Sequence, residues 1–372
     1  MRHAPTAPTA APAPSRLDLR PDHQQDPALE VLLDCLPDWP GNTPVLVVDD
    51  PIGRAEDALG GRGYLVTAWR RLAQGKRKAS AWPEGSGFAA ATLRMPRSKE
   101  ALDFALDAIA TTLLPGGEVL IYGGNDEGIK SVGTRLQDAW EAVETLDARK
   151  HSRVWRARLP STPRPARALE DHARSVDIEV PWGRFTHTVL PGVFAKGGLD
   201  DASLLLLSAV PAPPAGSHML DFACGPGTLA QALLLRDPTL KAQLLDADAP
   251  SVWCARRNVP GSLVACGDSW GALPAYQRYD LILSNPPIHS GKARDYTVVK
   301  RLIEGSAARL LPKGSLVMVV QGQVPVAEAL NEHFDLVEVL VDDGRFKVWR
   351  AGRLKDRYPG VEDDTAGPRR RR

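Results

Sequence analysis

The second half of the chain alternates short apolar segments with segments of helical periodicity, and this alternation constrains the fold more than any other feature. Strands that are separated by helices form a parallel sheet with helices on both faces. Asp248 and Pro250 fit the cap and the first turn of one such helix. The segment "DLVEVLVDDGRFKVWRA" (335–351) closes the series as an antiparallel hairpin with Asp343-Gly344 at its turn. Strands are expected at 218–223, 241–248, 262–268, 279–285 and 315–322, and helices at 227–237, 249–259, 293–311 and 326–333.

The first half carries a fainter copy of this pattern. "LLPGGEVLIYGGNDEGIKSV" (113–132) parallels "LLPKGSLVMVVQGQVPVAEA" (310–329), and "AATLRMPRSK" (90–99) stands where "LILSNPPIHS" (281–290) stands. We interpret this as an internal duplication. The alternative is that two α/β domains share only a general likeness. The expected division is a disordered tail (1–28), a first domain (29–157), a linker (158–175), a second domain (176–353) and a basic tail (354–372).

The composition is that of a globular protein in a reducing compartment. Of the 372 residues, 43% are hydrophobic and 24% are charged. The net charge of +1 argues against a protein that coats nucleic acid non-specifically, but it permits a local basic patch. The four cysteines have neither metal nor disulfide spacing, and the apolar run at 203–210 is too short to span a bilayer. The N-terminus lacks the apolar core of a signal peptide. We therefore expect a cytoplasmic protein without a metal site.

A glycine-rich turn follows the first strand of the second half in "LDFACGPGTLA" (220–230). Gly225 and Gly227 let the backbone approach a ligand closely, and the helix that follows adds unpaired N–H groups. Asp246 ends the next strand, where a carboxylate can accept both hydroxyls of a ribose. Asp268 follows the third strand, where a side chain can meet an adenine amino group. This order fits an adenosine compound across the carboxyl edge of the sheet, and a dinucleotide such as NAD is one alternative.

The fourth strand ends in an unusual corner, Asn285-Pro286-Pro287, within "DLILSNPPIHSG" (280–291). The prolines have no N–H group and hold the chain extended. The side-chain oxygen of Asn285 and the carbonyl of Pro286 could accept the two hydrogens of an exocyclic amine and turn its lone pair outward. Fixed carbonyl dipoles would also stabilise the positive charge that such an amine gains when it is alkylated. His289 is either a packing residue or a substrate contact.

These segments resemble S-adenosylmethionine-dependent methyltransferases of the Rossmann-like class. Their first motif, D-x-G-C-G-x-G, stands here as D-F-A-C-G-P-G, with Ala223 in place of the first glycine. The corner resembles the (D/N/S)-P-P-(Y/F) motif of amino-methyltransferases. Together with "TVLPGVFAKGGLDDASLLLLSAV" (188–210) and "DGRFKVWRA" (343–351), "SNPPIHSG" (284–291) resembles the ribosomal RNA small-subunit guanine-N2 methyltransferase C family.

This resemblance implies two tandem Rossmann-like methyltransferase domains, each a mostly parallel sheet covered on both faces, with a C-terminal antiparallel hairpin in the second. The first domain would serve folding and RNA binding, and the second would methylate the exocyclic N2 of a guanine in 16S rRNA or the small ribosomal subunit. The implied cofactor is S-adenosylmethionine, bound by Asp221, Ala223, Gly225, Gly227, Asp246 and Asp268. The implied catalytic residues are Asn285, Pro286 and Pro287, and the implied substrate contacts are Ile288, His289 and Phe194.

Two departures from the family pattern lie near the substrate. Ile288 replaces an aromatic residue that could stack on the target base, so either Trp270 or Phe194 compensates or the enzyme accepts weaker substrate binding. The segment "QGQVPV" (321–326) lacks the usual polar and aromatic run. Alternatives are therefore a large-subunit (23S) rRNA enzyme, an adenine-N6 or protein glutamine-N5 methyltransferase, a partner that binds adenosylmethionine without catalysis, and a dehydrogenase. Basic residues at 69–78 and 94–99 are candidates for RNA contact.

Overall fold

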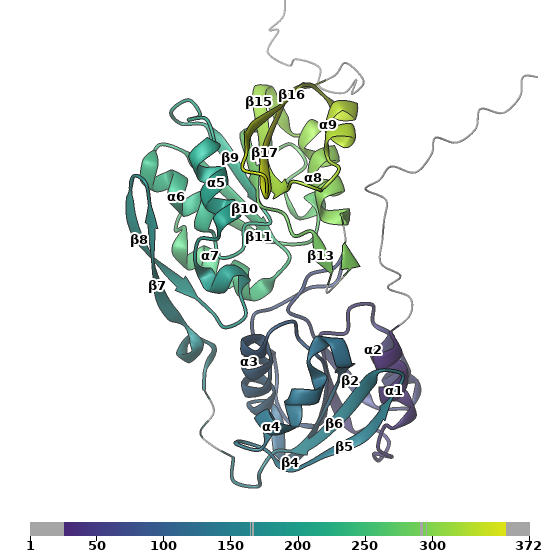
Figure 1. Cartoon of the computed structure of the whole chain (residues 1–372). Helices are drawn as coiled ribbons and strands as arrows, with labels where there is room; N and C mark the ends of the chain where they lie inside the picture. Colours follow the sequence, from purple (N-terminus) through teal and green to yellow (C-terminus); the bar gives the residue numbers. More distant parts are fainter. Residues whose placement is uncertain (1–25, 164, 166, 291–292, 295, 355–372) are drawn as a thin grey trace, which may run out of the picture.

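The computed structural model describes residues 26–354 except 164, 166, 291–292 and 295, and it contains one large sheet in each half of the chain (Figure 1). The predicted tails lie almost wholly outside the described residues. The first helix, α1 (Pro27–Asp34), begins inside the predicted tail because the Asp26 carboxylate accepts the N–H of Ala28 at 3.1 Å and caps it. At the other end, Leu354 is the last residue of a strand.

The second half folds into a seven-stranded sheet that confirms the predicted architecture. The strand order is β11-β10-β9-β12-β15-β17-β16, in which β9 to β12 and β15 are parallel and the last three form an antiparallel unit. The order reverses on either side of β9, which makes its carboxyl end the switch point. The strands are β9 (His218–Phe222), β10 (Lys241–Asp246), β11 (Leu263–Cys266), β12 (Tyr279–Ser284), β15 (Leu310–Gln321), β16 (Phe334–Asp342) and β17 (Phe346–Leu354).

Helices cover both faces of this sheet because successive strand residues point to opposite sides. Met219, Leu281 and Leu283 pack in one buried cluster with α5, α6 and α7, whereas Leu220 and Ile282 pack in another with α8 and α9. None of the helices in the described part of the chain is long and apolar enough to cross a membrane. The helices are α5 (Asp201–Ala209), α6 (Thr228–Arg236), α7 (Ala249–Asn258), α8 (Thr297–Ala307) and α9 (Ala327–His333).

The first half repeats this arrangement in a six-stranded sheet of order β2-β1-β3-β4-β6-β5. It also ends in an antiparallel hairpin, whereas the sequence pattern predicts such a hairpin for the second half alone. Its strands are β1 (Pro44–Val48), β2 (Leu65–Trp69), β3 (Phe88–Arg94), β4 (Leu113–Gly124), β5 (Glu141–Arg149) and β6 (Ser152–Arg158), and its helices after α1 are α2 (Arg54–Gly61), α3 (Lys99–Ala110) and α4 (Val132–Leu136).

The two sheets share a local irregularity that supports the duplication. The register of β3 on β4 shifts between Phe88 and Ala90, and that of β12 on β15 shifts between Tyr279 and Leu281. Both shifts fall beside the Leu-Leu-Pro-x-Gly segment that opens β4 and β15. A general likeness between α/β domains would not require the same irregularity at the same place.

Two segments differ from the predicted elements. The helix expected at 293–311 is shorter: β13 (His289–Ser290) pairs with β14 (Ala293–Arg294) before α8 begins, and β15 starts at Leu310 because Pro312 keeps the preceding residue extended. An unexpected hairpin of β7 (Arg174–Val180) and β8 (Gly183–Val189) precedes α5. Short 3-10 turns are η1 (Asn125–Glu127), η2 (Ile129–Ser131), η3 (Leu169–His172), η4 (Phe194–Gly197) and η5 (Trp270–Ala272).

The two halves contact each other through backbone and apolar groups. The segment after β2 pairs with the segment after β10: Ala73 donates its N–H to Ala247 at 2.8 Å, and Ala249 donates to Arg71 at 2.7 Å. Phe104 of α3 packs in one buried cluster with residues of β8, the loop after it and α7. The backbone contact lies directly after Asp246, so the first half supports the edge of the second sheet where the predicted site lies.

Candidate active site

The predicted site residues of the second half lie along one edge of its sheet. Asp221 is in β9, Asp246 ends β10, Asp268 follows β11 and Asn285 follows β12. These four strands are neighbours and run parallel, so their carboxyl ends meet at the same edge. Residues that are far apart in the sequence are thereby brought to one place.

The glycine-rich loop between β9 and α6 has a left-handed backbone at three positions. Ala223, Gly225 and Gly227 have φ values of 57°, 54° and 91°. At Ala223 this conformation costs on the order of 1–2 kcal/mol, which the loop tolerates in place of the family glycine. A Cβ added at Gly227 would lie 3.0 Å from Val259, whereas one added at Gly225 would meet only Phe194, at 3.9 Å. The backbone at Gly225 therefore faces open space that a ligand can enter.

Asp221 is fully buried below this loop, with one oxygen left without a partner. Its Oδ2 accepts the N–H of Ala230 at 3.1 Å, whereas its Oδ1 has no hydrogen-bond partner among the described residues. Burial raises the pKa of Asp221 to about 7. A buried acceptor without a donor is costly, so Oδ1 marks a place where a donor group of a ligand would be stabilised.

Asp246 joins the glycine-rich loop to the end of β10. Its Oδ2 accepts the N–H of Gly225 at 2.7 Å, and its Oδ1 accepts the N–H of Asp248 at 2.8 Å. Burial and the neighbouring carboxylate of Asp248 raise the pKa of Asp246 to about 6. Each oxygen of a carboxylate has a second lone pair, so Asp246 can accept two further donors such as the hydroxyls of a ribose.

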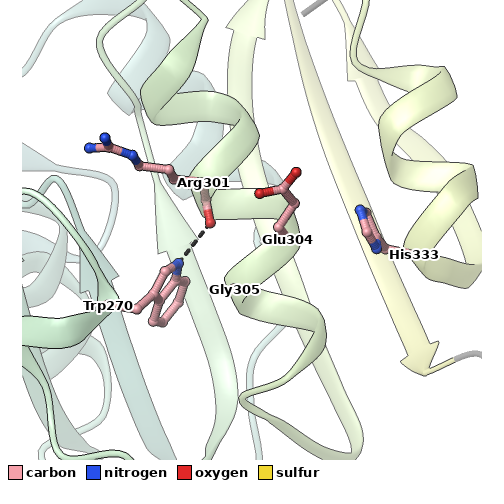
Figure 2. A pocket seen from close by; sticks show the side chains of 5 residues that line it. All are labelled: Trp270, Arg301, Glu304, Gly305 and His333. Carbon is pink, nitrogen blue, oxygen red and sulfur yellow. Dashed lines mark hydrogen bonds between the residues drawn. The ribbon is translucent and has the colours of Figure 1, made fainter. Parts of the chain in front are cut away.

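Asp268 and Trp270 are held by helix α8. Arg301 Nη1 donates to Asp268 Oδ2 at 3.3 Å. The Trp270 indole N–H donates to the Arg301 carbonyl at 2.7 Å (Figure 2). The indole also packs against the Phe222 ring at 4.9 Å, and a Cβ added at Gly305 would lie 1.8 Å from the indole nitrogen. Trp270 is therefore enclosed on several sides.

An open pocket of about 460 Å³ lies beside Trp270 (Figure 2). It extends from the indole along α8 to His333 of α9. None of the residues predicted to bind the cofactor or to catalyse the reaction lines it. The lining residues are Trp270, Arg301, Glu304, Gly305 and His333.

The Asn-Pro-Pro corner is anchored to the start of α5. Asn285 Nδ2 donates to Asp200 Oδ1 at 3.2 Å and to Ser203 Oγ at 3.0 Å. Pro286 is buried and Pro287 is exposed. Sequence reasoning missed Asp200 and Ser203, because their segment (188–210) served there only for the family resemblance and its apolar run (203–210) only to exclude a membrane span. The one available signal was the Asp-x-x-Ser pattern of an N-cap.

The predicted substrate contacts have different environments. Phe194 is 58% exposed, and it begins the strained turn η4 beside Gly225. Ile288 is half-buried and packs against the cluster that contains α8 and α9. His289 pairs through its backbone with Arg294, and its side chain lies outside what the structure describes. Of the two aromatic candidates for stacking on the base, Phe194 and Trp270, Phe194 is therefore the more accessible.

The thiols do not provide an alternative chemistry. All four cysteines are free, and burial raises the pKa of Cys35 and Cys266 to about 11 and that of Cys254 to about 12. Such groups are protonated, and therefore weak nucleophiles, at neutral pH. Within the described ranges, no group of three or more His, Cys, Asp or Glu residues could hold a metal ion.

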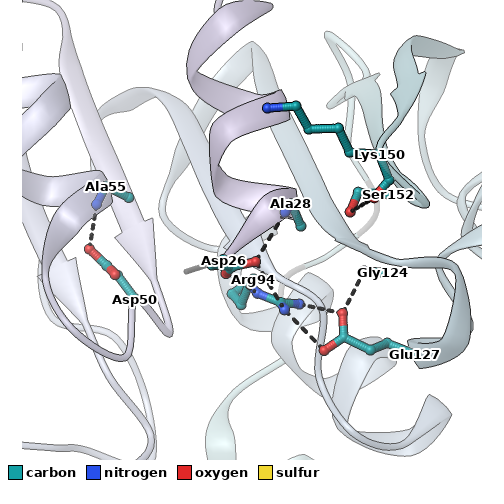
Figure 3. A network of polar contacts seen from close by, with 9 residues as sticks. All are labelled: Asp26, Ala28, Asp50, Ala55, Arg94, Gly124, Glu127, Lys150 and Ser152. Carbon is teal, nitrogen blue, oxygen red and sulfur yellow. Dashed lines mark hydrogen bonds and ion pairs between the residues drawn. The ribbon is translucent and has the colours of Figure 1, made fainter. Parts of the chain in front are cut away.

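Charged groups of the protein fill the corresponding edge of the first sheet (Figure 3). Arg94 ends β3, where the second sheet has its Asn-Pro-Pro corner, and it forms ion pairs with Asp26 at 2.8 Å and Glu127 at 2.7 Å. Asp50, which follows β1, is buried and accepts the N–H of Ala55 at 2.8 Å. This edge of the first sheet therefore keeps a carboxylate, Asp50, at the start of α2. Where the second sheet has Asn-Pro-Pro, the first has Arg94-Met95-Pro96.

Two family models match the chain. The "Methyltransferase small domain" model matches residues 184–350, and the "Methyltransferase small domain N-terminal" model matches residues 68–175. The fold is similar to a solved 16S rRNA N2 methyltransferase of T. thermophilus in complex with AdoMet and guanosine. The TM-score is 0.78 at 23% identity, over 88% of this chain and 92% of that one.

Curated relatives are similar to this chain over most of its length. A protein of Pseudomonas syringae pv. syringae, "Ribosomal RNA small subunit methyltransferase C", is 31% identical over 88% of this chain and 99% of its own length. A protein of the same name from Pseudomonas aeruginosa is 32% identical over 73% of this chain and 81% of its own length. With both halves matched, this chain belongs to the ribosomal RNA small subunit methyltransferase C family.

Proposed function

We propose that this chain is an S-adenosylmethionine-dependent methyltransferase that methylates the exocyclic N2 of a guanine in 16S rRNA of the small ribosomal subunit. The names of its relatives give small-subunit ribosomal RNA as their substrate, and the similar solved structure is that of a 16S rRNA N2 methyltransferase in complex with AdoMet and guanosine. The observation that carries the proposal is the shared sheet edge. It brings Asn285-Pro286 at the end of β12 beside the glycine-rich loop of β9 and Asp246 of β10.

The residues at this edge fit S-adenosylmethionine. Asp246 would accept the ribose hydroxyls, and Asp268 would accept the adenine amino group. The unpartnered oxygen of Asp221 and the open space at Gly225 are the local features that a ligand would complete. When bound, the cofactor supplies a methyl group activated by a sulfonium.

The corner would hold the nucleophile. The N2 lone pair of guanine is delocalised into the ring, so the free amine is a poor nucleophile. Asn285 Oδ1 and the Pro286 carbonyl would accept its two hydrogens and direct the lone pair toward the methyl group. These dipoles are fixed before the reaction and therefore stabilise the positive charge that develops on nitrogen. Phe194 and Ile288 would contact the base after it leaves its stack.

The first half would support the second half rather than bind a cofactor. It contacts the segment after Asp246, and its own sheet edge is filled by the Arg94 ion pairs. In the basic segment at 69–78, Arg70 and Arg71 form ion pairs with Glu56 and Asp49. If this segment contacts RNA, its exposed lysines would therefore make the contacts. With an rRNA substrate, the enzyme would act in the cytoplasm.

The test is methyl transfer to ribosomal RNA from cells that lack the gene. Mass spectrometry of nucleosides should show one N2-methylguanosine missing from 16S rRNA, and the purified protein with S-adenosylmethionine should restore it. Restoration in naked 16S rRNA or only in assembled small subunits would identify the form of the substrate. Methylation of 23S rRNA, of adenine N6 or of a protein glutamine instead would contradict the proposal.

Asp246→Ala should weaken the binding of S-adenosylmethionine by about 10-fold or more, because hydrogen bonds to a charged group contribute roughly 1.5–3 kcal/mol. Isothermal titration calorimetry measures this directly. Asp280→Ala is the matched control, since Asp280 lies at the opposite edge of the same sheet and accepts the N–H of His218. Equal affinities of the Asp246 variant and the parent protein would remove Asp246 from the cofactor site.

A further inference from the structure

We infer that Asp200 is a positioning residue for methyl transfer: it turns the amide of Asn285 so that the carbonyl oxygen faces the amine of the substrate. This inference rests on the proposed function and concerns a side chain that would touch neither the cofactor nor the base. Its basis is the pair of contacts that join Asn285 to the start of α5.

The orientation of the Asn285 amide follows from the chemistry of its neighbour. Asp200 Oδ1 and Oδ2 lie 3.2 and 3.4 Å from Asn285 Nδ2. An ionised carboxylate can only accept hydrogen bonds, so the NH₂ group must turn toward it and the carbonyl oxygen away from it. Ser203 Oγ, at 3.0 Å from the same nitrogen, is a second acceptor. In the opposite orientation, the carbonyl oxygen of Asn285 would face the carboxylate and the two acceptors would repel each other.

The position of Asp200 is itself fixed by the helix that it caps. Asp200 Oδ1 accepts the N–H of Ser203 at 3.0 Å, and Ser203 is buried at the first turn of α5. The amino end of a helix favours a negative charge at its cap. The two residues that hold the Asn285 amide are thus part of one rigid helix start.

The negative charge should also improve Asn285 as an acceptor. An amide whose N–H groups donate to a carboxylate is polarised, and its carbonyl oxygen becomes more negative. That oxygen faces the amine, which gains positive charge during the reaction. Asp200 would therefore act through Asn285 in two ways: by fixing the orientation of the amide and by increasing its dipole.

The test compares Asp200→Asn with Asp201→Asn in the full-length protein. Asparagine is as good a helix cap as aspartate, so Asp200→Asn preserves α5 but removes the charge that forces the amide orientation. Single-turnover methyl transfer to 16S rRNA should slow by about 10-fold to 100-fold, as expected for a lost hydrogen bond to a charged group. Calorimetric affinity for S-adenosylmethionine and the melting temperature should not change. Asp201 is 79% exposed and pairs with Arg345, so Asp201→Asn should leave the rate unchanged.

A double-mutant cycle separates positioning from a general structural role. If Asp200 acts through Asn285, the double variant Asp200→Asn, Asn285→Ala should be no slower than Asn285→Ala alone. Asp200→Ser, whose serine also caps the helix, should show the same slow rate as Asp200→Asn. It can be used in place of Asp200→Asn if the asparagine variant does not fold. Parent-like rates for both Asp200 variants, or rate losses that multiply in the double variant, overturn the inference alone. Absence of guanine-N2 methylation by the parent protein overturns the proposed function as well.

Discussion

Replacing Asn285 by alanine should slow methyl transfer by about 10²–10³-fold, the loss typical of one preorganised electrostatic partner of a transition state. The side chain is held by Asp200 and Ser203, so its oxygen needs no reorganisation when the substrate arrives. Alanine removes this acceptor but leaves the two prolines that shape the corner. The glycine-rich loop and Asp246 are untouched, so affinity for S-adenosylmethionine should stay near that of the parent protein.

Single-turnover kinetics with 16S rRNA measure this effect, and calorimetry with S-adenosylmethionine measures the binding that should remain. Asn331→Ala is a suitable control, because Asn331 is an exposed amide on α9 that donates to the carbonyl of Ala327 in its own helix. A wild-type single-turnover rate in the Asn285 variant would exclude its side chain from the mechanism. A parallel loss of rate and cofactor affinity would instead indicate that the corner shapes the cofactor site.

The architecture of the second half was predictable because its signals are local. Asp248 caps α7 and accepts the N–H of Ser251 at 2.9 Å, and Pro250 lies in the first turn, as the sequence indicates. The Asp343-Gly344 turn joins β16 to β17 as expected. Once the strands and helices are placed, parallel packing puts their carboxyl ends at one edge, and the candidate site follows from that.

The start of α8 and the β7–β8 hairpin were not predictable in the same way. Residues 293–294 have helix-compatible neighbours, yet they pair with 289–290 directly after the proline corner. The hairpin forms a separate two-stranded sheet beside α6 and α7, where the His187 Nδ1–H donates to Gln231 Oε1 at 2.6 Å. These are tertiary contacts, and local propensity does not encode them.

The sequence also does not reveal which charged and polar side chains pair with each other in the folded protein. Asp200 and Asn285 are 85 positions apart, so no spacing in the sequence links them. Arg70, Arg71 and Arg94 belong to basic stretches that suggested RNA contact, but each forms an ion pair within the first half. A count of charges cannot distinguish a solvated basic face from guanidinium groups already paired with carboxylates.

The contact between the two halves includes a buried ring, Phe104, whose contribution to stability could not be predicted from the sequence. Phe104 is 1% exposed on α3 and packs against Val189, Leu190 and Cys254 of the second half. Its ring also meets Trp82 at 5.3 Å. Leu102, on the same helix and 0% exposed, packs instead in the core of the first sheet. One helix thus serves both an internal core and the interface between halves.

Phe104→Ala should lower the free energy of unfolding by about 3–5 kcal/mol, because it removes a buried ring and leaves a cavity. Leu102→Ala should cost a comparable amount, about 2–5 kcal/mol, and is the matched control. Hydrogen exchange distinguishes the two: only Phe104→Ala should also speed amide exchange at 189–193 and in α7 of the second half. The difference in hydrogen exchange is expected because the cavity left by Phe104→Ala faces the second half, whereas the cavity left by Leu102→Ala faces the first sheet. Unchanged exchange at 189–193 in the Phe104 variant would mean that the interface contributes little to the stability of the second half.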